Sequence, residues 1–96
     1  MTNQEWKRRC VVRIYRAVRN AGRMRIRDLK RATNYNRGPA NESIPLWYDA
    51  LEYLEKKKAI VVERDSEFEV ETFVATPEAA NALKIEPMQL SSLMSS

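Results

Sequence analysis

Cationic side chains dominate the first 40 residues and are the groups in this chain best suited to binding chemistry. Residues 1–40 hold 12 Lys/Arg and two acids, a net charge of +10, whereas residues 41–96 hold five Lys/Arg and 11 acids, a net charge of −6. A surface that only keeps a protein soluble usually mixes both signs, so this asymmetry favours a polyanion partner. All but one of the cations that we single out are arginines, whose planar fork matches phosphate oxygens. They are Arg9, Arg13, Arg16, Arg25, Arg27, Lys30, Arg31 and Arg37.

Catalytic and metal-binding groups are scarce by comparison. The chain has no histidine, which excludes an imidazole base, a histidine metal ligand and a Ser-His triad. A single cysteine excludes a cysteine-cluster zinc site, and two glycines are too few for a phosphate-binding glycine loop. We interpret Cys10 as a small core residue and acid pairs such as Glu52/Glu55 as a solvated helix face. We therefore expect a protein that is not an enzyme and that needs no metal or cofactor.

The size and hydropathy of the chain limit its organisation. At 96 residues it is long enough for one domain with a modest core. No apolar run approaches the roughly 20 residues that span a bilayer, and no apolar segment follows the first charges as in a signal peptide. With one cysteine nothing indicates an oxidising compartment, so we expect a cytoplasmic protein without a membrane partner.

The first half of the chain predicts a helix, a short strand and a second helix. Thr2 and Glu5 have the spacing of a capping box, and the helix that follows should end at Gly22. Its apolar face is predicted to contain Cys10, Val11, Ile14, Ala17, Val18 and Ala21. Residues 23–27 alternate basic and apolar, which predicts a strand with Met24 and Ile26 turned inward. A short helix over about residues 27–34 should bury Leu29 and Ala32.

The second half is organised around residues 43–64. Ser43 can cap a helix there, and cationic Lys56, Lys57 and Lys58 suit its C-terminal end. The apolar stripe of this helix is Ile44, Trp47, Leu51 and Leu54, and Trp47 is expected in the core. Strands at residues 60–63 and 68–74 should flank a turn at 65–67, with Phe68 and Val70 facing the core. Thr76-Pro77-Glu78 predicts the start of a fourth helix that ends near Lys84. We expect one domain over residues 1–85 and a disordered tail over 86–96.

Two passages carry a resemblance to a known family. Residues 26–33, Ile-Arg-Asp-Leu-Lys-Arg-Ala-Thr, resemble the second helix of winged helix-turn-helix domains, and residues 50–62 resemble the family's "aLxxLexxgxI" passage into the wing. The resemblance covers about residues 3–84 and implies an α+β winged helix, in which three helices and a short strand precede a β-hairpin wing. It further implies DNA binding, in replication or in regulation of transcription. Within the family, the chain is similar to winged-helix modules of phage, plasmid and mobile-element replication proteins such as primase–helicases.

The charges conflict with the usual docking of that family, in which the third helix enters the major groove. The outward face of the third helix carries Asp49, Glu52 and Glu55, and the expected wing is also acidic. Carboxylates repel a phosphate array, and more strongly at low salt. One account is that duplex DNA contacts the second helix, the Arg37 loop and the N-terminal end of the third helix, which adds Asn41, Ser43 and Tyr48 to the candidate site.

Two other accounts stay open at this point. In one, the arginines of the first helix and the following strand grip nucleic-acid backbone without reading bases. In the other, the domain is a protein–protein adaptor whose contact surface is the acidic wing together with Trp6, Tyr35 and Tyr48. The oligomeric state is open as well, although Val12 on the exposed side of the first helix and the Met88–Met94 tail are candidate dimer contacts.

Overall fold

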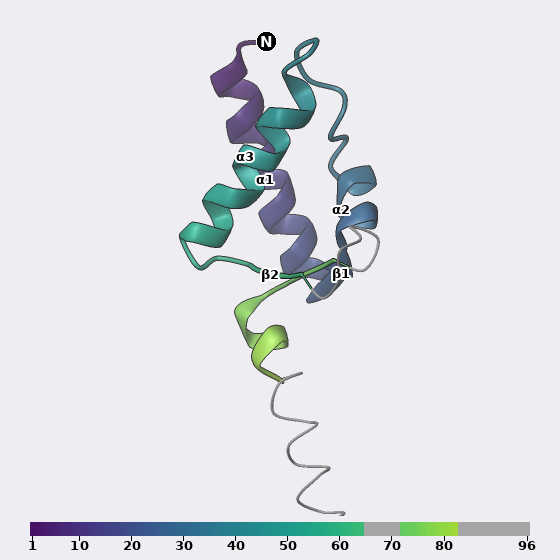
Figure 1. Cartoon of the computed structure of the whole chain (residues 1–96), viewed down its shortest axis with the longest axis vertical. Coiled ribbons are helices and arrows are strands. Elements are labelled where there is room, and N and C mark those ends of the chain that lie inside the picture. Colours follow the sequence, from purple (N-terminus) through teal and green to yellow (C-terminus); the bar gives the residue numbers. More distant parts are fainter. Residues whose placement is uncertain (65–71, 83–96) are drawn as a thin grey trace, which may run out of the picture.

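The structure is a computed structural model and describes residues 1–64 and 72–82. In this part of the chain four helices combine with a three-stranded antiparallel sheet, so the fold is α+β (Figure 1). The elements with defined bounds are α1 (Asn3–Ala21), β1 (Arg23–Arg25), α2 (Ile26–Ala32), α3 (Ser43–Lys56), β2 (Val61–Glu63) and β3 (Phe73–Ala75), and residues 77–82 are helical. The expected positions of Phe68 and Val70, the end of the last helix near Lys84 and the tail 86–96 lie outside the described residues.

Helix α1 begins and ends where the sequence predicts. The Thr2 hydroxyl accepts a hydrogen bond from the Glu5 amide at 3.2 Å, and Gly22 ends the helix at φ 76°, where its amide donates to the Val18 carbonyl at 2.7 Å. The side chains of Trp6, Cys10, Ile14 and Val18 recur every four residues and are all buried. Ala21, predicted on the apolar face, is instead exposed because the chain turns away at Gly22.

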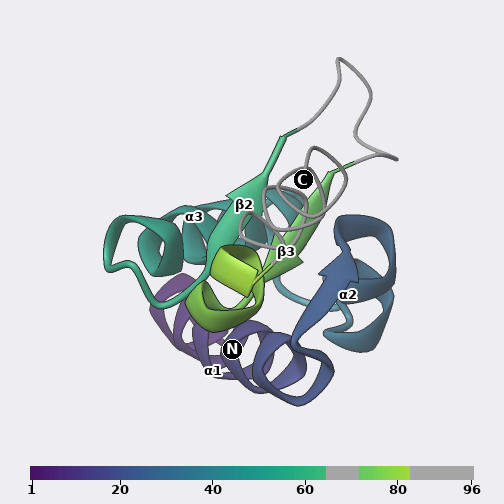
Figure 2. The ribbon, with the colours of Figure 1, turned by 90° about the horizontal axis from the view of Figure 1, so that it is seen from below.

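The three strands form a sheet in the order β1-β3-β2. Met24, Val74 and Val62 lie opposite one another and pack against the core, whereas the neighbouring row of Arg25, Phe73 and Glu63 lies on the outer face. Ile26 is buried as predicted, but as the first residue of α2, and its amide donates to the Thr72 carbonyl at 3.0 Å. Figure 2 shows the sheet between α2 on one side and α3 on the other.

Three predictions about α2 and α3 are wrong, two of them on burial and one on helix capping. Ala32 is exposed, and the next residue, Thr33, turns into the core in its place. Ile44 is 43% exposed because it lies in the first turn of α3, while Trp47, Ala50, Leu51 and Leu54 form the buried stripe of this helix. Ser43 is not an N-cap: it is the first residue of α3, and its hydroxyl bonds the preceding loop.

The core lies where α1 and α3 pack side by side above the sheet (Figure 1). Its two largest side chains, Trp6 and Trp47, are fully buried. The last helix begins as predicted, because the Thr76 hydroxyl accepts from the Ala79 amide at 3.1 Å and Pro77 occupies the first turn. The Thr76 amide also donates to the Gly22 carbonyl at 2.8 Å, which fixes the start of this helix to the end of α1.

The connection from α3 to β2 contains a backbone conformation that suits glycine. Lys58 has φ 61°, and the Ala59 amide that follows donates to the Leu54 carbonyl at 3.0 Å. A side chain in the left-handed region costs about 1–2 kcal/mol, and the cost is largely absent for glycine.

Replacing Lys58 with glycine should therefore stabilise the protein. We expect a gain of about 0.5–1 kcal/mol once the larger entropy of glycine in the unfolded chain is subtracted. For a domain of this size the gain corresponds to a rise in melting temperature of roughly 4 °C, measurable by circular dichroism. The matched control is Lys57→Gly, at φ −78°, which should lower the melting temperature. Equal effects of the two substitutions would contradict this account.

Candidate nucleic-acid interface

Lys30 and Tyr48, both predicted site residues, lie together between α2 and α3. The Lys30 ammonium nitrogen is 4.9 Å from the centroid of the Tyr48 ring and 5.6 Å from that of the Tyr35 ring. Arg27 and Arg31, one helical turn apart on α2, are exposed. We call the surface formed by Arg27, Lys30, Arg31, Tyr35 and Tyr48 the α2–α3 surface. It presents three cations beside two aromatic rings, which is a composition suited to nucleic acid.

Buried hydrogen bonds hold the two helices of this surface in place. The Trp47 indole nitrogen donates to the Thr33 hydroxyl oxygen at 2.8 Å, and that hydroxyl donates to the Leu29 carbonyl at 2.7 Å. The Trp47 ring also meets the Tyr48 ring edge to face, with centroids 5.1 Å apart. The position of Tyr48 therefore depends on a core residue of α3 that is bonded to α2.

Three predicted site residues lie at the loop of residues 34–42: Arg37 and Asn41 are within it, and Ser43 begins α3 directly after it. Arg37 and Asn41 are exposed, and Asn41 has φ 65°. Ser43 is buried, with its hydroxyl accepting from the Gly38 amide at 2.8 Å and donating to the Tyr35 carbonyl at 2.7 Å. Since this hydroxyl is engaged in shaping the loop, we leave Ser43 out of the candidate interface.

The cations of β1 form a second group on the outer face of the sheet. The Arg23 guanidinium carbon lies 3.7 Å from the centroid of the Phe73 ring, and that of Arg25 lies 5.6 Å from it. Arg23 also pairs with Glu63, with Nε 2.8 Å from the carboxylate oxygen. The sequence reasoning left Arg23 out of the site, and its pairing makes Arg25 the cation of this strand that is better placed to bind phosphate.

The arginines of α1 form a third group. Arg9 and Arg16 are exposed, while Arg13 is half-buried with its guanidinium carbon 5.8 Å from the centroid of the Trp6 ring. Trp6 itself is 1% exposed and its indole nitrogen donates to the Ser43 carbonyl at 3.1 Å. The expectation that Trp6 belongs to an adaptor surface is therefore wrong, because the ring is enclosed by the start of α3 and the loop before it.

Ion pairs within the described residues neutralise acidic side chains of α3 and β2 and involve none of the predicted arginines. Glu52 pairs with Lys56 at 3.1 Å, and Glu55 pairs with Arg64 at 2.9 Å. The bond to Glu55 raises the pKa of the Arg64 guanidinium, which stays charged. Along residues 1–64 and 72–82, no salt bridge engages any of the predicted arginines, which are Arg9, Arg13, Arg16, Arg25, Arg27, Arg31 and Arg37.

Cys10 lacks the features of a nucleophile. Its side chain is fully buried in α1, and burial raises the pKa of the thiol to about 11, against a smaller lowering effect of Arg13. The thiol is therefore neutral at pH 7 and serves as a small core residue, as predicted. In the described part of the chain, no group of three or more His, Cys, Asp or Glu side chains is placed to hold a metal ion. No described helix is long and apolar enough to cross a membrane.

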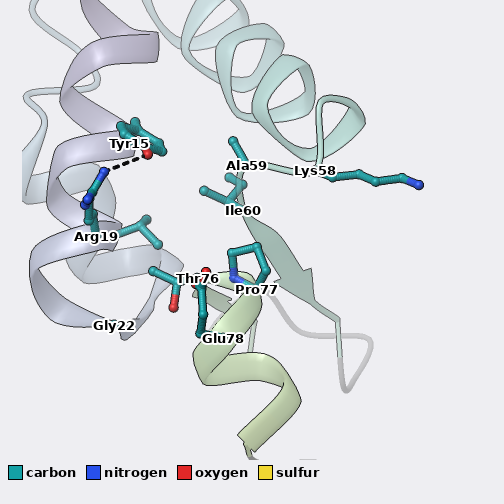
Figure 3. A pocket seen from close by; sticks show the side chains of 10 residues that line it. Tyr15, Arg19, Gly22, Lys58, Ala59, Ile60, Thr76, Pro77 and Glu78 are labelled. Carbon is teal, nitrogen blue, oxygen red and sulfur yellow. Dashed lines mark hydrogen bonds between the residues drawn. The ribbon is translucent and has the colours of Figure 1, made fainter.

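A cavity of about 530 Å³ lies on another side of the molecule, between α1, the α3–β2 connection and the last helix. Figure 3 shows Tyr15 and Arg19 on one wall and Ala59 and Ile60 on the other. Arg19 donates a hydrogen bond to the Tyr15 hydroxyl at 3.1 Å. The rest of the wall combines apolar side chains with Lys58, Thr76 and Glu78, a set that indicates no particular chemistry.

Comparison of the chain with protein-family models, with curated proteins and with solved structures finds no match. The candidate interface is therefore inferred only from the positions, exposure and contacts of the residues of this chain. The sequence predicts all the cations of the α2–α3 surface. It does not predict that the Tyr35 ring contacts Lys30 or that Thr33 supports Trp47. The sequence did contain a signal for these contacts, because Thr33 directly follows a short amphipathic helix and aromatic residues come after it in the chain.

Proposed function

We propose that this chain is a winged-helix domain that binds duplex DNA through the α2–α3 surface and Arg37, without enzymatic activity, in replication or transcription. The order of helices and strands and the antiparallel three-stranded sheet support the winged-helix assignment. Lys58 supports it further, because it stands at the glycine position of the family's passage into the wing and has a φ of 61°.

The observation that carries the proposed function is that three arginines of α2 and the loop after it are exposed and are not neutralised by carboxylates of the described residues. Arg27, Arg31 and Arg37 are exposed, and among the described residues they have no carboxylate partner. Phosphate can therefore bind them without breaking an existing ion pair, and each phosphate that is neutralised releases counterions. The acids Glu55 and Glu63, which oppose such a partner, are already paired with Arg64 and Arg23.

The arginines of α1 have a different part in this proposal. Arg9 and Arg16 lie on α1, whereas the α2–α3 surface is formed by residues of α2, α3 and the loop between them. We assign to them the long-range attraction that raises the rate of encounter with DNA, rather than contacts in the bound complex. Their removal should slow association more at low salt than at high salt.

The test is a triple substitution of Arg27, Arg31 and Arg37 by alanine. We expect binding to a generic 20-base-pair duplex to weaken by roughly 10- to 100-fold, and the slope of log K against log salt to fall by about 2 to 3, since each lost phosphate contact removes about 0.9. Fluorescence anisotropy between 50 and 200 mM salt measures both quantities.

A matched control separates the local contacts from the net charge. Arg19→Ala, Lys57→Ala and Lys58→Ala together remove the same charge from the end of α1 and from the α3–β2 connection, which lie apart from α2. This control should change the slope by less than about 1. The proposal fails if the Arg27/Arg31/Arg37 variant, still folded by circular dichroism, binds with the affinity and salt slope of the parent protein.

A further inference from the structure

Large apolar side chains are exposed along the side of the molecule where α1 and the C-terminal half of α3 lie together. Val12 and Tyr53 are each 45% exposed, and Tyr15, one turn further along α1, is 37% exposed. Val12 and Tyr53 line a shallow groove of about 520 Å³, together with Gln4, Lys7, Arg8 and Val11. We call this groove and its rim the α1–α3 patch.

The rim of the α1–α3 patch has cations on α1 and both an acid and a cation at α3, where the Lys57 ammonium nitrogen lies 5.8 Å from the centroid of the Tyr53 ring. Arg8 and Lys7 lie on the α1 side, with Arg8 one turn before Val12. Asp49 lies on the α3 side, one turn before Tyr53, and is exposed. Arg8 and Asp49 have no salt-bridge partner within the part of the chain that the structure describes.

A surface with this arrangement is complementary to itself. A two-fold axis through the groove would bring α1 of one copy against α3 of the other, so that each Arg8 meets the Asp49 of the second copy. Val12 and Tyr53 would then be buried at the centre, where aromatic anchors contribute most to association. From the exposed apolar centre and the paired charges we infer that the α1–α3 patch binds a second copy of this chain in a two-fold dimer.

Other occupants fit the patch less well. Nucleic acid would be attracted by Lys7 and Arg8, but it would also have to contact the Asp49 carboxylate and an apolar centre, which oppose that attraction. None of Arg27, Arg31 and Arg37 belongs to the patch, so the dimer is independent of the proposed DNA binding. A dimer would carry two α2–α3 surfaces in a fixed relation, as proteins that recognise paired half-sites do.

Sedimentation equilibrium of the full chain tests the inference through Val12→Lys. We expect the parent protein to be dimeric, and Val12→Lys to raise the dimer dissociation constant by roughly tenfold or more, since it places a charge at the centre of the interface. The matched control is Ile44→Lys, which changes an equally exposed apolar residue outside the patch and should leave the dimer intact. Both positions are on the surface, so both variants should fold.

A charge exchange tests the pairing itself. Arg8→Asp alone and Asp49→Arg alone should each weaken the dimer, whereas the double variant should restore it, because the exchanged pair keeps its attraction. A parent protein that is monomeric at every concentration, or a dimer insensitive to Val12→Lys, would overturn the inference. Failure of the double variant to recover would show that Arg8 and Asp49 do not meet and would overturn the two-fold arrangement.

Discussion

Replacing Gly38 with alanine should destabilise the protein by about 3 kcal/mol, because overpacking beside a buried ring forces backbone and side chain apart. A Cβ atom on Gly38 would overlap the indole of Trp6, with Nε1 only 2.6 Å away. The indole cannot move aside freely, since Trp6 is fully buried and its Nε1 donates to the Ser43 carbonyl. The Gly38 amide is held as well, by its 2.8 Å bond to the Ser43 hydroxyl. Urea unfolding monitored by circular dichroism measures the loss.

Gly22→Ala is the matched control for this substitution. No atom lies within 4 Å of a Cβ built on Gly22, so its only cost is the positive φ of 76°, about 1 kcal/mol. Gly38→Ala should therefore cost clearly more, and it should lose much of its effect when Trp6 is replaced by leucine in the same chain. Equal losses at the two glycines would show that the contact with Trp6 is relieved by loop movement.

Local signals in the sequence were sufficient for both ends of α1 and for the start of the last helix. Thr2 and Thr76 have side-chain oxygens at the right spacing, and Gly22 supplies a left-handed residue, so each end is decided by residues within one turn. The burial of Cys10, Ile14 and Val18 was predictable for the same reason, from their spacing of four residues. These features are decided by residues that are close to one another in the sequence, so the sequence alone is enough to predict them.

Features that depend on distant residues were predicted less well. The burial of Trp6 requires the 34–42 loop and the start of α3 to close over it, and nothing near Trp6 in the sequence shows that contact. Ile44 fits the apolar spacing of α3 yet lies at its first turn, where no other element covers it. The arginine partners of Glu55 and Glu63 are likewise 9 and 40 residues away in the sequence. The sequence alone therefore overstated the negative charge of α3 and β2. The cations of the candidate site and Tyr48 were predictable, whereas the contacts of Lys30 with the Tyr35 and Tyr48 rings were not.

Replacing Trp47 with alanine should cost about 3–5 kcal/mol, since it empties the position of a fully buried indole. A domain of this size has a total stability of about 5–10 kcal/mol, so this substitution should remove roughly a third of it or more. Thermal melting followed by circular dichroism measures the effect. The matched control is Ile44→Ala, which removes an exposed apolar side chain of the same helix outside the α1–α3 patch and should change stability little.

The hydrogen bond of Trp47 can be separated from its volume by a double-mutant cycle with Thr33. Thr33→Val leaves the indole N–H buried without its acceptor, at a cost of about 1–3 kcal/mol, whereas Trp47→Phe removes the donor itself. Adding Thr33→Val to Trp47→Phe should then cost less than Thr33→Val alone, because no donor remains to be left unpaired. Additive effects would mean that the 2.8 Å contact contributes nothing to the link between α2 and α3. Since the Trp47 ring also supports Tyr48, the same cycle measured by DNA affinity would show how far the core determines the α2–α3 surface.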